Sequence, residues 1–284
     1  MIAFYGHDSV DMNHGPEVHQ KLCLPRSNDI VRSMCYARAL GDCSAKRSAE
    51  HYISRAVLKE VSGDKPPIVQ GLRRLSDGPW PLTALTSNIL CSHHNSALSP
   101  LDTEGAKVVR YLRNFQTGLD SNVRFPSSEK VTVDGPLFER WLLKVAFGLA
   151  KATQIGSGQT TLVQLRDEEK LLEILFGRRD WPENWGLYLN FVGGQPFNAP
   201  VMTDGTTAGF GGEPLSVDGI LWAMRFSIRS IPFILAFGKP DNIEPAAYRP
   251  AGVQLGRSGS PYKVLEFSWT DREDHVLLDL FRIG

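Results

Sequence analysis

The sequence is poor in cysteine, has no net charge and contains no long apolar run. Its four cysteines are unevenly spaced over 284 residues and do not form a disulfide framework. We therefore expect the thiols to be metal ligands or core residues in a reducing, cytoplasmic setting. Basic and acidic side chains both number 31, which excludes a global nucleic-acid signature. Lys144 interrupts the longest apolar stretch, residues 141–150, so no membrane span is expected.

Several signals of other functions are also missing. The first residues, Met-Ile-Ala-Phe-Tyr-Gly-His, have neither the basic nor the apolar region of a secretory signal. Residues 156–161 are rich in Gly, Ser and Thr but lack the lysine of a phosphate-binding loop. Residues 209–212, Gly-Phe-Gly-Gly, are most simply a turn. No nucleophile elbow or Ser-His-Asp spacing is evident.

The balanced charge is unevenly distributed along the chain. Residues 32–115 carry 12 basic and 7 acidic side chains, which gives this segment a net charge of +5. Residues 1–31 carry 2 basic and 4 acidic side chains, and residues 116–284 carry 17 and 20. A local basic excess fits a partner with a phosphate backbone.

The basic segment also contains a motif in two parts. Glu50 and His51 form the first part, and the second runs from Asn88 to Asn95. An acidic residue beside a histidine can combine a metal ligand with a general base, because neutral imidazole titrates near working pH. Neighbouring side chains of an extended strand point to opposite faces, so this pairing requires a β-bulge or bend.

Together the two parts resemble an HNH (ββα-metal) endonuclease site, over roughly residues 35–115. In that family an acidic-His pair ends or follows the first strand. An Asn precedes a short apolar stretch on the second strand. A Cys-x-x-Cys or Cys-x-x-His pair then leads to a final His or Asn. The resemblance implies that Glu50 and Asn95 hold a catalytic Mg²⁺ or Mn²⁺. It also implies that His51 activates water and that Asn88 braces the loop.

Each of these residues has a simpler interpretation as well. Asn88 could be an ordinary turn residue, and Asn95 could cap the helix that begins near residue 96 or 99. His93 is interpreted as a solvated neighbour of His94. The Glu50-His51 dipeptide is common in proteins and carries little weight without the second half of the motif.

A structural zinc site is the second prediction from this segment. Zinc prefers four nitrogen or sulfur ligands in a tetrahedron, and Cys91-x-x-His94 has the usual local spacing. The other pair is Cys35 and Cys43, which have seven residues between them. Cys23 is a reserve candidate, and if Cys35 is merely a buried core residue the site has three ligands or none.

We expect an α+β protein of two folded parts: an N-terminal HNH-like module (33–118) after a flexible arm (1–32), then an α+β domain with a mostly antiparallel sheet (128–284). Apolar periodicity predicts helices near residues 101–115, with Asp102 as cap, and near 136–152 and 167–176. Apolar runs predict strands near residues 186–192, 221–228, 231–237, 262–269 and 275–281.

The leading functional hypothesis is a metal-dependent endonuclease that hydrolyses phosphodiester bonds, most plausibly in DNA. RNA cleavage would use the same residues. The alternative is a zinc-stabilised module that binds nucleic acid or protein and has a vestigial HNH site. The second domain, whose role is unknown, is the candidate for substrate selection or for a protein partner.

Overall fold

The computed structural model describes residues 34–120, 129–152, 156–157, 161–162, 164–190, 209–229, 231–238, 246–257, 263–270 and 277–283. Within these ranges the protein combines helices with sheets built mainly of antiparallel pairs, as expected of an α+β fold. The expected N-terminal arm and Cys23 lie outside the described residues.

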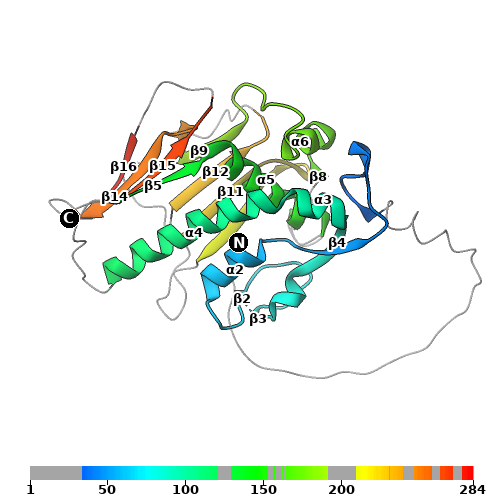
Figure 1. Cartoon of the computed structure of the whole chain (residues 1–284), viewed down its shortest axis with the longest axis horizontal. Helices are drawn as coiled ribbons and strands as arrows, with labels where there is room; N and C mark the ends of the chain where they lie inside the picture. The colour runs from blue at the N-terminus through cyan, green and yellow to red at the C-terminus, as the bar shows by residue number, and fades with distance from the viewer. Residues whose placement is uncertain are drawn as a thin grey trace, which may run out of the picture.

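The described helices lie in the first two thirds of the chain, and most of the residues in strands lie in the last third (Figure 1). The helical segments are η1 (Arg38–Leu40), α2 (Arg55–Ser62), η2 (Leu82–Leu85), α3 (Ser92–Ala97), α4 (Ser99–Asp120), α5 (Gly135–Lys151) and α6 (Glu168–Leu175). The strands of the first part are β1 (Arg47–His51), β2 (Ile68–Val69), β3 (Gly78–Pro79) and β4 (Thr86–Cys91). The later strands are β5 (Glu129–Asp134), β6 (Gly156–Ser157), β7 (Thr161–Leu162), β8 (Gln164–Leu165), β9 (Gly186–Asn190), β10 (Phe210–Val217), β11 (Ile220–Ile228), β12 (Ile231–Ala236), β13 (Ala246–Tyr248), β14 (Gly252–Arg257), β15 (Lys263–Ser268) and β16 (Leu277–Ile283).

Two larger sheets form the second part of the fold. One has the strand order β10-β11-β12-β9-β13, with β8 pairing in parallel to β11. The other has the order β16-β14-β15-β5, in which β14 and β15 are antiparallel and the two outer pairs are parallel. Strands β1 and β4 form a separate antiparallel pair, and so do β2 with β3 and β6 with β7.

Helix α5 is the central element of the core. Its first turn is capped by Asp134, whose side chain accepts a hydrogen bond from Leu137 N at 2.8 Å, and Pro136 suits this turn because it lacks an N–H. The helix is apolar on almost every side, as expected of a helix surrounded by protein. Phe138 contacts Phe233 of one large sheet and Phe267 of the other. Helix α5 therefore packs against both sheets.

One hydrophobic core joins the two parts of the chain. It contains residues of the first part, among them Tyr52, Leu90 and Leu112, together with Trp141, Phe233 and other residues of the second. Figure 1 shows α4 lying across the molecule in front of α5 and the sheets. The predicted boundary near residues 118–128 thus separates segments that are packed together in the folded protein.

The predicted helices and late strands are confirmed, but some local interpretations are wrong. Residues 209–212 are not a turn, because β10 begins at Phe210 and pairs with β11 along its length. No strand was predicted in the polar residues before Pro136, but β5 lies there and pairs with β15. Asp102 is not the cap of the long helix, which begins at Ser99. The two strands are stabilised by pairing with β11 and β15. Their local residue preferences do not indicate a strand.

We expect Gly105→Ala to destabilise the protein, because α4 approaches α5 closely at this glycine. A Cβ at residue 105 would overlap the Trp141 ring, whose indole is fully buried. Overpacking of this kind costs about 1–3 kcal/mol of unfolding free energy. Thermal melting should therefore show a clear fall for Gly105→Ala. Thr103→Ala, an exposed change on the same helix, is the control and should stay within about 0.5 kcal/mol of the wild type. Equal melting temperatures for both variants would contradict this packing.

Candidate functional site

The two parts of the split motif come together as a strand pair followed by a helix. Strand β1 ends at His51, β4 ends at Cys91, and α3 begins at Ser92. The pairing of β1 with β4 is irregular between Ser48 and Glu50, where β4 contains one residue more than β1. The extra residue therefore lies in β4, at Asn88 and Ile89, opposite the segment just before Glu50, whereas the expected bulge was in the strand that carries the Glu50-His51 pair.

A tight loop before β1 brings two cysteines back to the strand pair. Cys35 is buried just ahead of η1, and the chain then reverses through Gly41 and Asp42, both with positive φ. Glycine and aspartate tolerate this left-handed conformation better than most residues. The reversal places Cys43 near Cys35 in space despite the seven residues between them.

The thiols of Cys35, Cys43 and Cys91 surround one nitrogen of His94. Their Sγ atoms lie 3.5, 3.7 and 3.3 Å from His94 Nδ1. A tetrahedral zinc ion with a Zn–S distance of about 2.3 Å and a Zn–N distance of about 2.0 Å holds sulfur and nitrogen about 3.5 Å apart. All four ligand atoms lie within 4.8 Å of one another. The cluster therefore has the donor set and the spacing of a Cys₃His metal site, consistent with structural zinc.

The acidity of the thiols also fits a cation. Burial raises the pKa of Cys35 to about 12, so this thiol stays protonated unless a positive charge lies close to it. Burial would also raise the pKa of Cys91, but hydrogen bonds from the His94 backbone and from Ser44 lower it overall. Metal binding requires thiolates, and a bound zinc ion would supply the charge that Cys35 needs.

Contacts outside the cluster hold the cysteine loop in place. Ser44 Oγ lies 2.9 Å from Ser92 Oγ and accepts a hydrogen bond from His93 N at 3.2 Å. Arg178, from the turn after α6, donates to the Leu40 carbonyl at 2.8 Å. The Phe176 ring packs edge-on against His94 at 5.2 Å. The second part of the chain therefore helps to position the metal centre.

Glu50 lies in the interior and meets a lysine there. Its side chain is 4% exposed, and Glu50 Oε1 lies 2.8 Å from Lys144 Nζ. Lys144 belongs to α5 and also donates to the two carboxylate oxygens of Asp102, at 2.6 and 2.7 Å. Burial raises the pKa of Glu50, and the positive charge of Lys144 opposes that rise. The three side chains form a cluster of two carboxylates and one ammonium, in which Glu50 and Lys144 are buried and Asp102 is half-buried.

Two more side chains extend this cluster. Ser54 donates a hydrogen bond to Asp102, and Trp141 Nε1 donates to Ser54 Oγ at 2.8 Å. Lys144 was not predicted to be a member of the site, and Asp102 was predicted only to be a helix cap. The available signal was a lone lysine in the apolar stripe of a buried helix, because a buried lysine almost always has an acidic partner.

His51 presents one ring nitrogen without a partner. Its Nε2 atom is buried and makes no hydrogen bond with the described residues. Burial lowers the pKa of His51, nearby Arg55 and Lys144 lower it further, and a hydrogen bond to the Leu82 backbone opposes them. Nε2 can act as a proton acceptor in the neutral tautomer that carries its proton on Nδ1.

The remaining candidates lie on β4 and α3. Asn95 is half-buried within α3, and its Nδ2 donates to Ser48 Oγ of β1 at 2.6 Å. Its side chain therefore joins the helix to the strand pair at the irregular point and does not cap a helix. Asn88 and His93 are exposed. Glu50 and Asn95, the predicted ligands of the catalytic cation, thus have separate contacts, with Lys144 and Ser48.

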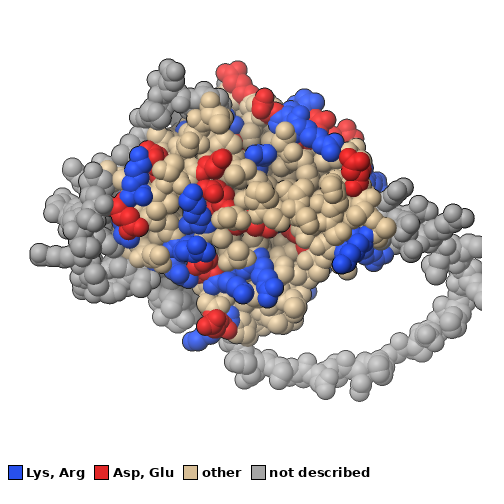
Figure 2. All heavy atoms as spheres, viewed as in Figure 1, with Lys and Arg blue, Asp and Glu red and all other residues tan. Residues whose placement is uncertain are grey.

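Basic side chains gather on the face over α2 and the adjoining part of α4 (Figure 2). Some of them are paired, since Arg110 and Arg113 both contact Glu60 at 2.7 Å. No helix in the described parts of the chain has the length and apolarity to cross a membrane. Comparison of the chain with protein-family models, curated proteins and solved structures gives no significant match.

Proposed function

We propose that this protein is a zinc-stabilised, metal-dependent endonuclease that cleaves nucleic acid, with DNA as the favoured substrate. The observation that carries the proposal is the β1–β4–α3 unit. In it the Glu50-His51 pair of β1 follows the point where β4 contains an extra residue, and Asn95 of α3 is hydrogen-bonded to Ser48 of β1. The Cys₃His cluster lies at the junction of β4 and α3 and would fix the helix against the strands.

His51 would be the general base of this reaction. Hydrolysis of a phosphodiester needs a group that takes a proton from the attacking water. The free Nε2 lone pair of His51 suits this role, and the lowered pKa keeps the ring neutral and able to accept the proton. Asn95 would maintain the geometry by holding α3 against β1. Exposed Asn88, on the strand paired with β1, is the proposed brace of the neighbouring loop.

A divalent cation such as Mg²⁺ or Mn²⁺ would supply charge stabilisation at the phosphate. Glu50 and Asn95 carry oxygen donors of the kind these cations prefer. Glu50 already faces an ammonium group, however, with Lys144 Nζ at 2.8 Å. The side chains therefore fit a divalent cation in two cases. Either the Glu50 carboxylate turns away from Lys144, or it contacts the Lys144 ammonium and the divalent cation together.

This contact with Lys144 also favours a second candidate function. If Lys144 is the permanent partner of Glu50, the carboxylate is structural and the motif is vestigial. The protein would then be a zinc-stabilised module that binds nucleic acid or a protein partner. The reduced thiols of the described cysteines fit the proposed cytoplasmic setting in either case.

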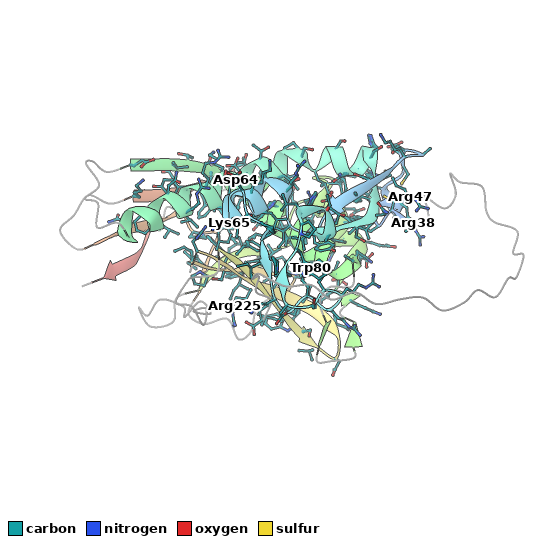
Figure 3. All side chains as sticks on the ribbon, turned by 90° about the horizontal axis from the view of Figure 1, so that it is seen from below. Arg38, Arg47, Asp64, Lys65, Trp80 and Arg225 are labelled. Atoms are coloured by element: carbon teal, nitrogen blue, oxygen red, sulfur yellow. The ribbon has the colours of Figure 1, made fainter. Side chains whose placement is uncertain are left out.

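The exposed charge near the metal centre fits a phosphate backbone. Arg38 of η1 and Arg47 of β1 are exposed and project from the same end of the molecule, while Lys65 and Trp80 lie away from that end (Figure 3). Arginine binds phosphate through paired N–H donors. We propose that this end of the protein receives the nucleic acid, and that the sheets of the second part select the substrate or a partner.

Nicking of supercoiled plasmid DNA tests the proposed activity. We expect the purified protein to convert supercoiled plasmid to nicked or linear forms with Mg²⁺ or Mn²⁺, and EDTA should stop the reaction. A parallel reaction with single-stranded and structured RNA separates a deoxyribonuclease from a ribonuclease. Retarded migration of the plasmid without cleavage, under all metal conditions, would favour the binding module over the nuclease.

A further inference from the structure

A cleft lies between the start of α5 and the turn that follows α6, and none of the metal-centre residues lines it. Its volume of about 640 Å³ falls within the usual range for small-molecule sites, about 300–1,000 Å³. The lining includes the side chains of Arg140, Arg179, Arg249 and Trp181. Three guanidinium groups and an indole around one cleft indicate a ligand with both an anionic group and a flat ring.

Arg140 is the cation of this cleft that has no acidic partner. It is half-buried, its Nε donates to the Pro136 carbonyl at 3.3 Å, and no carboxylate pairs with it among the described residues. A Cβ added at Gly177 would lie 2.5 Å from an Nη atom of Arg140, so the guanidinium rests directly against the chain there. The side chain is therefore held in position, and no carboxylate of the described residues lies within ion-pair distance of it.

The other two arginines are neutralised by glutamates. Arg249 contacts both carboxylate oxygens of fully buried Glu139, at 3.1 and 2.9 Å, and its guanidinium lies 5.3 Å from the centre of the Trp269 ring. Arg179 pairs with Glu173 at 2.5 Å on the surface. Arg249 and Arg179 therefore shape the cleft and supply N–H donors. Arg140 supplies the positive charge that has no carboxylate partner among the described residues.

The cleft also contains groups that a simple anion would not use. Trp181 is half-buried in the lining, and Asp134 and Asp180 are exposed there. Asp134 accepts the capping hydrogen bond of α5, whereas the Asp180 carboxylate is an acceptor for N–H groups of a ligand. The two carboxylates would repel a phosphate ion and could not bind any other part of it. A ligand with an aromatic ring, N–H donors and one phosphate would use all of these groups.

We propose that this cleft binds a nucleoside 5′-phosphate, with the phosphate at Arg140 and the base between Trp181 and Asp180. Base stacking on an aromatic side chain and charge-assisted hydrogen bonds to phosphate are the interactions that such a ligand requires. The ligand is either a free nucleotide or the 5′-phosphorylated end of a strand. The site uses neither His51 nor the cysteine cluster, so it stands apart from the proposed nuclease centre.

Isothermal titration calorimetry with deoxyguanosine 5′-monophosphate tests the site, because guanine presents two adjacent N–H donor groups to a carboxylate. We expect saturable binding to the full-length protein, with deoxyguanosine and inorganic phosphate each binding at least about 10-fold more weakly. Arg140→Gln should weaken binding of the nucleotide about 10-fold or more. Lys65→Gln removes an equal charge from an exposed residue outside the cleft and should change affinity less than about twofold.

A 5′-phosphorylated single-stranded octanucleotide identifies the source of the ligand. Tighter binding than that of the mononucleotide, weakened in Arg140→Gln, assigns the cleft to a strand end, and failure to bind assigns it to a free nucleotide. The proposal is overturned if the wild type binds neither ligand at concentrations up to about 10 mM, a range that covers even weak sites. Binding by a folded Arg140→Gln variant as tight as that of the wild type would also overturn it.

Discussion

Cys91→Ser should remove most of the bound zinc and lower the melting temperature by about 10 °C or more, because structural zinc contributes several kcal/mol of folding free energy. Cys91 ends β4 and its Sγ lies 3.3 Å from His94 Nδ1. A serine oxygen is a poor replacement for a thiolate at zinc. Loss of the ion would leave buried Cys35 and His94 without the charge that holds the cysteine loop against β4.

Cys23→Ser is the matched control for this experiment. Cys35, Cys43, Cys91 and His94 already supply the four ligands of a tetrahedral zinc site, so replacement of the remaining cysteine, Cys23, should leave zinc content and melting temperature unchanged. Chelation of the wild type should reproduce the Cys91→Ser melting curve. A Cys91→Ser protein that melts at the wild-type temperature would show that the thiols are packed core residues and not ligands.

His51→Ala should lower the rate of metal-dependent cleavage by about 100-fold or more while the protein stays folded, since general-base catalysis contributes rate factors of this size. The effect follows from the free Nε2 atom of His51, which is the proposed proton acceptor at the end of β1. The rate of plasmid nicking under single-turnover conditions measures it, and the melting temperature and zinc content show whether the variant is folded.

His93→Ala is the corresponding control, because His93 is exposed on α3 beside the zinc ligand His94. Its loss should change the cleavage rate less than about twofold if it takes no part in the reaction. Equal cleavage by folded His51→Ala and wild-type protein would remove His51 from the mechanism. Activity that depends on His93 instead would assign the base to the neighbouring histidine.

The zinc ligands were predictable because chemistry and local geometry agree. Cys91 and His94 are three residues apart at a strand-to-helix junction, which places both side chains on one side of α3. Cys35 and Cys43 follow from the need for two more ligands. The turn at Gly41 and Asp42 that makes their long spacing possible depends on two residues with positive φ, and their spacing alone does not show it.

The partner of Glu50 was not predictable, because it comes from a distant part of the chain. Lys144 lies 94 positions after Glu50 and reaches it only because the fold brings this part of α5 to the end of β1. The sequence shows the lysine as an interruption of an apolar stretch. Its contact with Glu50 and Asp102 depends on tertiary packing. Strand β5 was missed for a similar reason, since it is defined by parallel pairing with β15.

The ligand set of the metal centre provides the most direct test of the account, because the proposed nuclease site is built on it. Elemental analysis and zinc K-edge X-ray absorption of the purified protein should show about one zinc ion per chain, with three sulfur ligands at about 2.3 Å and one nitrogen ligand at about 2.0 Å. These ligands correspond to Cys35, Cys43, Cys91 and His94. Folded protein that contains no metal, or zinc bound only by oxygen and nitrogen, would contradict the account.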